Sequence, residues 1–162
     1  MQVLAVRTHV FKSGDDLVSI VVKSLREHDI ELKNGDILAI SSKVVASTER
    51  RIVSLREIQP SEKARELAIK YSLEPEFAEL VLRESKRIYG GVRKSILTLK
   101  NGILTVNAGI DNKNAPVGYV ALWPLSPQGR ADKIREEIKQ QTGKSVGVII
   151  VCLLYTSDAA DE

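Results

Sequence analysis

The sequence has little of the chemistry that many binding and catalytic sites use. It contains one cysteine, Cys152, and two histidines, His9 and His28. A single cysteine excludes a disulfide within the chain, and neither histidine has a second ligand at the spacing of a zinc site. The glycine-rich phosphate loops GxxxxGK[ST] and GxGxxG are absent, as is the GxSxG nucleophile elbow. The residue pattern therefore identifies no catalytic side chain.

Long apolar runs and aromatic clusters are also lacking. No stretch of about 18 apolar residues occurs, so the sequence predicts no membrane-spanning helix. The first residues lack the pattern of a secretion signal, which favours a cytoplasmic location. Aromatic residues make up 4% of the chain, and no basic run accompanies them, so stacking of nucleic-acid bases is not indicated.

The final residues, 152–162 (CLLYTSDAADE), are interpreted as a foreign tail. In one reading frame, their codons match the end of a transposon-based sequencing-library adaptor; a natural disordered terminus is the alternative. We therefore expect residues 1–151 to be native and 152–162 to be adaptor-derived. Without the three acidic residues of the tail, the chain has 18 acidic and 24 basic side chains, so its net charge is +6 in place of +3. This excess suits an anionic ligand such as a nucleotide phosphate.

Periodicity and turn residues predict an α+β fold, with a mixed sheet, hairpins and packed helices in one domain. Strands are expected at residues 2–6, 37–40, 95–99, 103–106, 119–123 and 146–150. Helices are expected at residues 17–28, from 60 and from 75 onward, and at 127–142. The pair Asn101-Gly102 predicts a hairpin between two strands, because glycine accepts a positive φ.

The segment 107–114 is the most informative candidate site. It follows a predicted strand, where loops often carry ligands. The carboxylate of Asp111 is a hard oxygen donor suited to magnesium or manganese, and Asn114 offers an amide to a ligand. A polar turn is the simpler alternative, since Asn and Asp favour turns for backbone reasons. The run Ser41-Ser42-Lys43, after a buried strand, likewise suits either phosphate contacts or, more simply, a helix cap with a solvated lysine.

Several segments resemble the coenzyme F-420 γ-glutamyl ligase family, over essentially all of residues 1–150. They are KSGDDL, NGDILAISSKVVASTERRIVSL, SEKARELA, VNAGIDNKNAPVGYVALWPLSPQGRADKIREEI and TGKSVGVII. The segment 122–124 is also similar to a bacterial subgroup proposed to act in folate metabolism. The resemblance implies a ligase that joins L-glutamate through its amino group to an acceptor carboxylate. Such enzymes use GTP, two divalent cations (manganese or magnesium) and often potassium, and proceed through an acyl phosphate.

Carried over to this chain, the resemblance implies that Asp111 is a metal ligand and that Ser42 and Asn114 contact GTP. Lys43 matches the lysine that many family members have at this position. The resemblance also implies small-molecule substrates, no membrane or nucleic-acid partner, and a homodimer in the full-length protein.

The chain departs from the family pattern at several positions. Most relatives have a GTP-contacting lysine where this chain has Ser47, and a glycine where it has Arg50. Thr8-His9-Val10-Phe11 replaces a Gly-Leu-Pro-Leu segment that lines GTP in relatives. After Ile150 the sequence lacks the aspartate and hydroxyl that bind metals in the family. We therefore expect residues 1–151 to be the front part of such a ligase, without catalytic activity alone.

Two alternatives stay open. The same chemistry on a folate-type acceptor fits the sequence as well as an F-420 precursor does. The net charge of +6 also fits a non-enzymatic nucleotide- or RNA-binding module, for which salt-sensitive binding without metal dependence is the expected signature.

Overall fold

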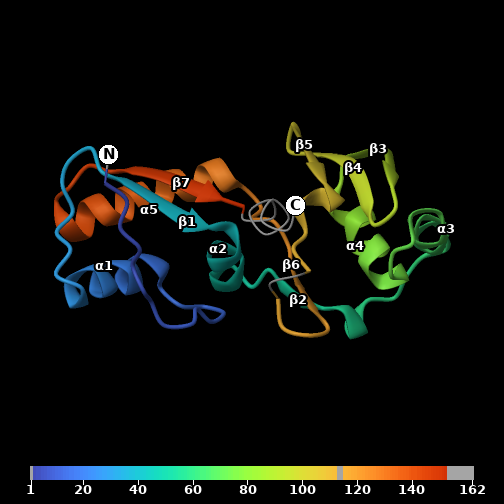
Figure 1. Ribbon diagram of the computed structural model, residues 1–162, viewed down its shortest axis with the longest axis horizontal. Coiled ribbons are helices and arrows are strands. Elements are labelled where there is room, and N and C mark those ends of the chain that lie inside the picture. The colour runs from blue at the N-terminus through green and yellow to red at the C-terminus, as the bar shows by residue number, and fades with distance from the viewer. Residues whose placement is uncertain (1, 113–114, 153–162) are drawn as a thin grey trace. The chain divides into compact units, whose positions relative to one another are not determined.

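The computed structural model describes residues 2–112 and 115–152 (Figure 1). Its α-helices are α1 (Leu17–Glu27), α2 (Ser42–Thr48), α3 (Glu62–Tyr71), α4 (Pro75–Glu84) and α5 (Pro127–Thr142). Its strands are β1 (Ile37–Ser41), β2 (Ile52–Ser54), β3 (Arg87–Val92), β4 (Ser95–Lys100), β5 (Ile103–Val106), β6 (Tyr119–Ala121) and β7 (Gly147–Val151). Short 3₁₀ turns are η1 (Leu55–Glu57) and η2 (Asn107–Gly109). The predicted α+β class is confirmed.

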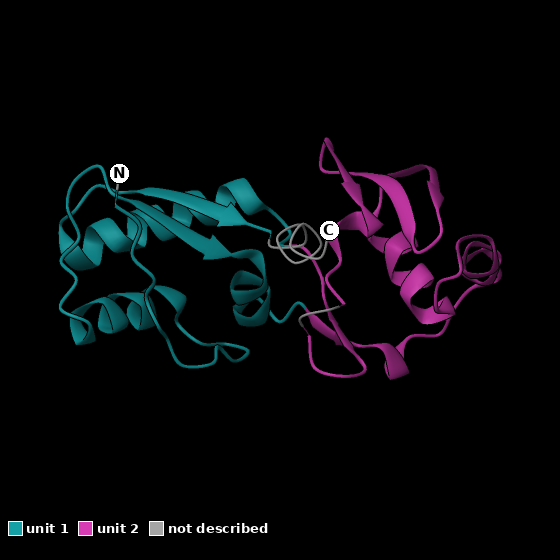
Figure 2. Cartoon of the chain, viewed as in Figure 1, with its two compact units in different colours: residues 1–51, 124–162 teal, residues 52–123 magenta. Residues whose placement is uncertain are grey.

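The chain divides into two compact units where the sequence predicted one domain. Unit 1 comprises residues 1–51 and 124–162, and unit 2 comprises residues 52–123 (Figure 2). Each unit buries its own apolar cluster. The periodicity of apolar residues predicts which face of an element is buried, but not which cluster that face joins. No linker-like composition marks either boundary, so the division into two units was not predictable from the sequence.

Unit 1 packs helices against a parallel strand pair. β1 and β7 pair in parallel, with Ser41 opposite Val151 at their carboxyl ends. α5 packs against β7, and α1 packs against α5. Asp16 begins α1 by accepting a hydrogen bond from the Ser19 N–H at 3.1 Å, and this bond holds the pKa of the Asp16 carboxyl below its usual value. The core residues of these elements include Leu17, Ile134 and Ile138, all fully buried.

Unit 2 joins two short helices to an antiparallel sheet. Ser61 caps α3 through its side chain, and Pro75 occupies the first turn of α4, as the sequence predicted. Strands β3, β4 and β5 form an antiparallel sheet in that order. Asn101 and Gly102 both have positive φ, 50° and 79°, which confirms the predicted hairpin between β4 and β5. A shorter antiparallel pair joins β2 to β6.

The strand predictions differ from the structure at residues 2–6 and at two strands that were not predicted, β2 and β3. Residues 2–6 form no strand, because an apolar run becomes a strand only where it finds a hydrogen-bonding partner. Strand β3 was not predicted because it contains Gly90-Gly91, and glycine is depleted in strand interiors. There the register shifts between Ile88 and Gly90, and a Cβ at Gly91 would lie 2.3 Å from the Ser95 carbonyl oxygen. These glycines are therefore part of the strand, at a bulge and a close backbone approach.

Within the described ranges, no helix is long and apolar enough to cross a membrane. The sequence predicted that the native protein ends at residue 151 and that a foreign tail follows. Residues 153–162 of this tail lie outside the described part of the chain. The adaptor origin of that tail therefore stays a prediction.

Candidate functional site

The turn that leaves β5 has an unusual backbone. Asn107, Ala108 and Gly109 all have positive φ, at 49°, 55° and 71°. Left-handed backbone disfavours side chains with a Cβ by about 1–2 kcal/mol per residue, and alanine lacks the polar side chain that helps asparagine adopt it. Such strain persists only where surrounding contacts hold the backbone in place, so we describe the contacts of each residue of this turn.

Asn107 ties the turn to the start of β4. Its side-chain oxygen accepts a hydrogen bond from the Ile96 N–H at 2.8 Å. Its side-chain nitrogen donates to the Lys94 carbonyl at 3.1 Å. A protein hydrogen bond contributes about 1 kcal/mol net, so these two bonds are of the size needed to offset the left-handed backbone.

Thr98 holds the next residue from the middle of β4. The Ala108 N–H donates to the Thr98 hydroxyl oxygen at 2.9 Å, and that hydroxyl donates onward to the Thr105 carbonyl at 2.8 Å. Thr98 and Ala108 are both fully buried. The hydroxyl therefore satisfies a buried amide that would otherwise be unpaired, at a position where no water competes.

Gly109 completes the turn through its lack of a side chain. A Cβ at this position would lie 3.0 Å from ring atoms of Trp123. The ring therefore packs closely over the turn, and the positive φ of 71° adds a second reason for glycine.

Asp111 lies directly beyond this turn, half-buried. Its N–H donates to the Ala121 carbonyl, and its carbonyl accepts from the Ala121 N–H, both at 2.8 Å. The backbone of Asp111 is thus fixed from two sides, by the η2 turn and by the end of β6. Such a carboxylate suits a hard cation. In the described part of the chain no three His, Cys, Asp or Glu side chains gather in a way that could hold a metal ion, so the residues described around Asp111 do not by themselves form a metal site.

Ser42 and Lys43 lie at the start of α2, directly after β1. The preceding residue, Ser41, caps this helix: its side-chain oxygen accepts from the Lys43 N–H at 3.3 Å. The cap that sequence reasoning offered as the simpler alternative is therefore present, on Ser41. Because Ser41 pairs with Val151, Ser42 begins its helix beside the carboxyl end of β7.

Two of the departures from the family pattern, Ser47 and Arg50, lie on and just after α2. The Ser47 hydroxyl donates to the Lys43 carbonyl at 2.9 Å, within the helix. Arg50 has a φ of 59°, and the Arg51 N–H donates back to the Ala46 carbonyl at 2.8 Å. Arg50 therefore keeps the left-handed turn that a glycine would form at the end of a helix. The backbone at this position therefore has the conformation that a glycine would adopt, although the residue is an arginine.

Comparison with known proteins places these features in a family. The family model described as "F420-0:Gamma-glutamyl ligase" matches residues 5–161. The chain belongs to this family. Among curated proteins, it is 40% identical over 141 residues to the "Coenzyme F420:L-glutamate ligase" of Archaeoglobus fulgidus, covering 87% of this chain and 55% of that protein.

Two further F420:L-glutamate ligases give similar values. The protein of Methanopyrus kandleri is 38% identical over 140 residues, which are 86% of this chain and 54% of that protein. The protein of Methanothermobacter thermautotrophicus is 34% identical over 139 residues, covering 85% and 55%. The chain thus spans a little over half the length of these curated relatives. The resemblance to the γ-glutamyl ligase family is confirmed.

The predicted site residues of this family member fall in different parts of the chain. Ser42 and Lys43 are neighbours in unit 1, and Asp111 belongs to unit 2. Asn114 lies outside the described residues. The sequence pattern indicated no role for Thr98 or for the Asn107 side chain, because their contacts with the turn join positions about ten residues apart. The signal available was the Asn-Ala-Gly run itself, in which two residue types favour a positive φ.

Proposed function

We propose that this chain is part of a GTP- and divalent-cation-dependent ligase that joins the amino group of L-glutamate to a carboxylate on a small acceptor. The observation that supports this most directly is Asp111, fixed at the end of a strained turn in a member of the γ-glutamyl ligase family. The named relatives are enzymes, which favours an enzyme over a non-enzymatic binding module.

The residues take the following roles in this proposal. Asp111 is one ligand of magnesium or manganese, and a bound cation would neutralise phosphate charge as it develops. Ser42, Lys43 and Asn114 contact GTP. Potassium is a further candidate cation. The remaining cation ligands come from outside the described residues.

The proposed chemistry has two steps. An oxygen of the acceptor carboxylate attacks the γ-phosphorus of GTP, which forms an acyl phosphate and releases GDP. The amine of glutamate then attacks the acyl carbon, phosphate leaves with the electrons of the broken C–O bond, and the amine loses a proton. The product is an amide. Lys43 supplies positive charge near the phosphates in the first step.

Several features of the whole enzyme remain part of the proposal. An F-420 precursor is the favoured acceptor because of the names of the relatives, and a folate-type acceptor is the alternative. A homodimer and a cytoplasmic location are likewise expectations for the full-length protein.

Binding of a fluorescent GTP analogue to the chain, with and without Mg²⁺, tests the proposal. We expect binding that requires Mg²⁺ and that weakens in Asp111→Asn and in Lys43→Ala. Lys23→Ala is the matched control, because Lys23 is an exposed lysine of α1 that pairs only weakly with Glu27 at 3.7 Å. Nucleotide binding that ignores both Mg²⁺ and Asp111→Asn would contradict the proposal, and salt-sensitive RNA binding without metal dependence would favour the alternative module.

A further inference from the structure

The η2 turn is held by two side chains of different elements that lie outside the candidate ligand set. Thr98 comes from β4, and Asn107 is the first residue of the turn. Neither offers a charge to a ligand, and each uses its polar atoms on the backbone around the turn.

These contacts fix the direction in which the chain leaves the turn. The Thr98 hydroxyl holds the N–H of Ala108, and the Asn107 carbonyl accepts from the Ile110 N–H at 3.0 Å. Ile110 is itself 2% exposed and anchored in the core of unit 2. Asp111 is the next residue, so its Cα position follows from the two held residues before it.

On the side away from the turn, the backbone of Asp111 pairs with Ala121. Its two hydrogen bonds with Ala121 form an isolated bridge rather than part of a longer ladder. A shift of the η2 turn is therefore transmitted to Asp111, since a single bridge allows a twist that a continuous strand pair would resist.

We propose that Thr98 and Asn107 are positioning residues for cation binding by Asp111. This inference rests on the proposed function, in which Asp111 is a metal ligand. Their effect is on the affinity of the cation site, because a ligand must be held within a fraction of an ångström of its productive position. Loss of residues that orient a metal ligand typically weakens metal affinity by about 10- to 100-fold.

The test is an NMR titration of the chain with Mn²⁺, which broadens amide signals close to the bound ion and detects weak sites. The half-point for loss of the signals of Ile110 and Asp111 is measured in each variant. We expect Thr98→Val to raise this half-point by about 10- to 100-fold, because valine keeps the shape but removes the hydroxyl. Thr98→Ser retains the hydroxyl and should restore binding.

A destabilised control variant distinguishes a loss of cation affinity from a general loss of stability. Ser61→Ala removes the cap of α3 in the same unit without touching the turn, and it should leave the half-point unchanged while lowering the unfolding midpoint. Asn107→Gly is the second variant, because it removes both side-chain bonds but accepts the positive φ without strain. If Thr98→Val does not fold, the half-point measured for Asn107→Gly tests the positioning role by itself.

The outcomes separate the two proposals. If Asp111→Asn abolishes the selective broadening but Thr98→Val and Asn107→Gly leave the half-point as in the wild type, the positioning inference is overturned and the proposed function stands. If Asp111→Asn leaves the broadening unchanged, or the wild type shows none at these residues, this chain holds no cation at Asp111 and both proposals fail.

Discussion

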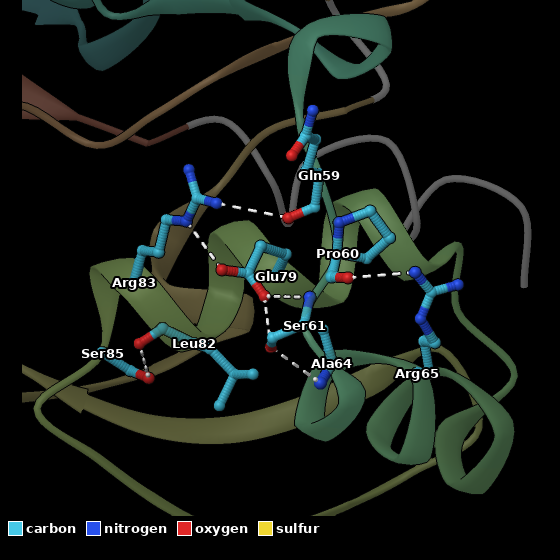
Figure 3. Close-up of polar contacts among 9 residues, drawn as sticks. All are labelled: Gln59, Pro60, Ser61, Ala64, Arg65, Glu79, Leu82, Arg83 and Ser85. Carbon is cyan, nitrogen blue, oxygen red and sulfur yellow. Dashed lines mark hydrogen bonds and ion pairs between the residues drawn. The ribbon is translucent and has the colours of Figure 1, made fainter.

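The carboxylate of Glu79 offers the sharpest stability prediction. It lies on α4, 8% exposed, and holds the amino end of α3 (Figure 3). One oxygen accepts from the Ser61 N–H at 3.0 Å and from the Ser61 hydroxyl at 2.6 Å. The other oxygen accepts from Arg83 Nε at 2.8 Å. These bonds, chiefly those from Ser61, lower the pKa of Glu79 from 4.5 to about 2.

The magnitude follows from this pKa. A drop from 4.5 to about 2, at about 1.4 kcal/mol per pKa unit, corresponds to about 3 kcal/mol of stability supplied by the ionised carboxylate. Since the folded-state pKa is the lower one, this contribution is complete above pH 4.5 and is lost as the pH falls toward 2. Glu79→Gln removes the charge and turns an amide N–H₂ toward one of its donor partners, so we expect a loss of about 3 kcal/mol near neutral pH.

Urea unfolding followed by tryptophan fluorescence measures this loss, because Trp123 is the single tryptophan and belongs to unit 2. Glu66→Gln is the matched control: it is an exposed carboxylate on α3, and we expect little change. The difference between wild type and Glu79→Gln should shrink between pH 4.5 and 2. A difference that is small at pH 7, or one that stays constant down to pH 2, would show that the ionised Glu79 carboxylate does not stabilise unit 2.

Three further predictions concern backbone strain and buried charge. Arg50→Gly should stabilise unit 1 by about 1 kcal/mol, because glycine adopts the φ of 59° freely; urea unfolding followed by circular dichroism checks this, and a loss of stability would contradict it. Gly109→Ala should destabilise unit 2 by more than about 1 kcal/mol and shift the fluorescence of Trp123, whose ring lies 3.0 Å from the added Cβ; an unchanged spectrum and midpoint would be the opposing result. Lys100→Met should destabilise unit 2 by about 3–5 kcal/mol, because it removes the ammonium that pairs with the carboxylate of Glu84, a side chain that is 15% exposed. Calorimetry measures this loss of stability, and adding Glu84→Gln should recover part of it.

Local signals predicted the elements that depend on local contacts. Ser61, Pro75 and Pro127 each mark a helix start, and the structure begins α3, α4 and α5 there. The Asn101-Gly102 hairpin also follows from two residues and their φ preferences. In each case the residues that decide the structure lie within one turn of each other.

Features that depend on distant partners were not predictable in the same way. β7 was expected as a strand, but its parallel pairing with β1 joins residues more than 100 positions apart. The division into two units likewise depends on which apolar residues pack together.

The candidate site shows the same division. Asp111 was identified from its own loop, because its residue type and its place after a strand are visible in the sequence. Thr98 looked like any strand residue, and only the hydrogen bond to Ala108 shows that it supports the turn.

The position of a bound cation in a crystal would show whether Asp111 is a metal ligand. Crystals of the chain grown with Mn²⁺ and GTP, measured at the manganese absorption edge, give an anomalous peak wherever the ion binds. We expect a peak within bonding distance of an Asp111 carboxylate oxygen, and we expect Asp111→Asn to abolish it. A manganese peak elsewhere, with none at Asp111, would contradict it.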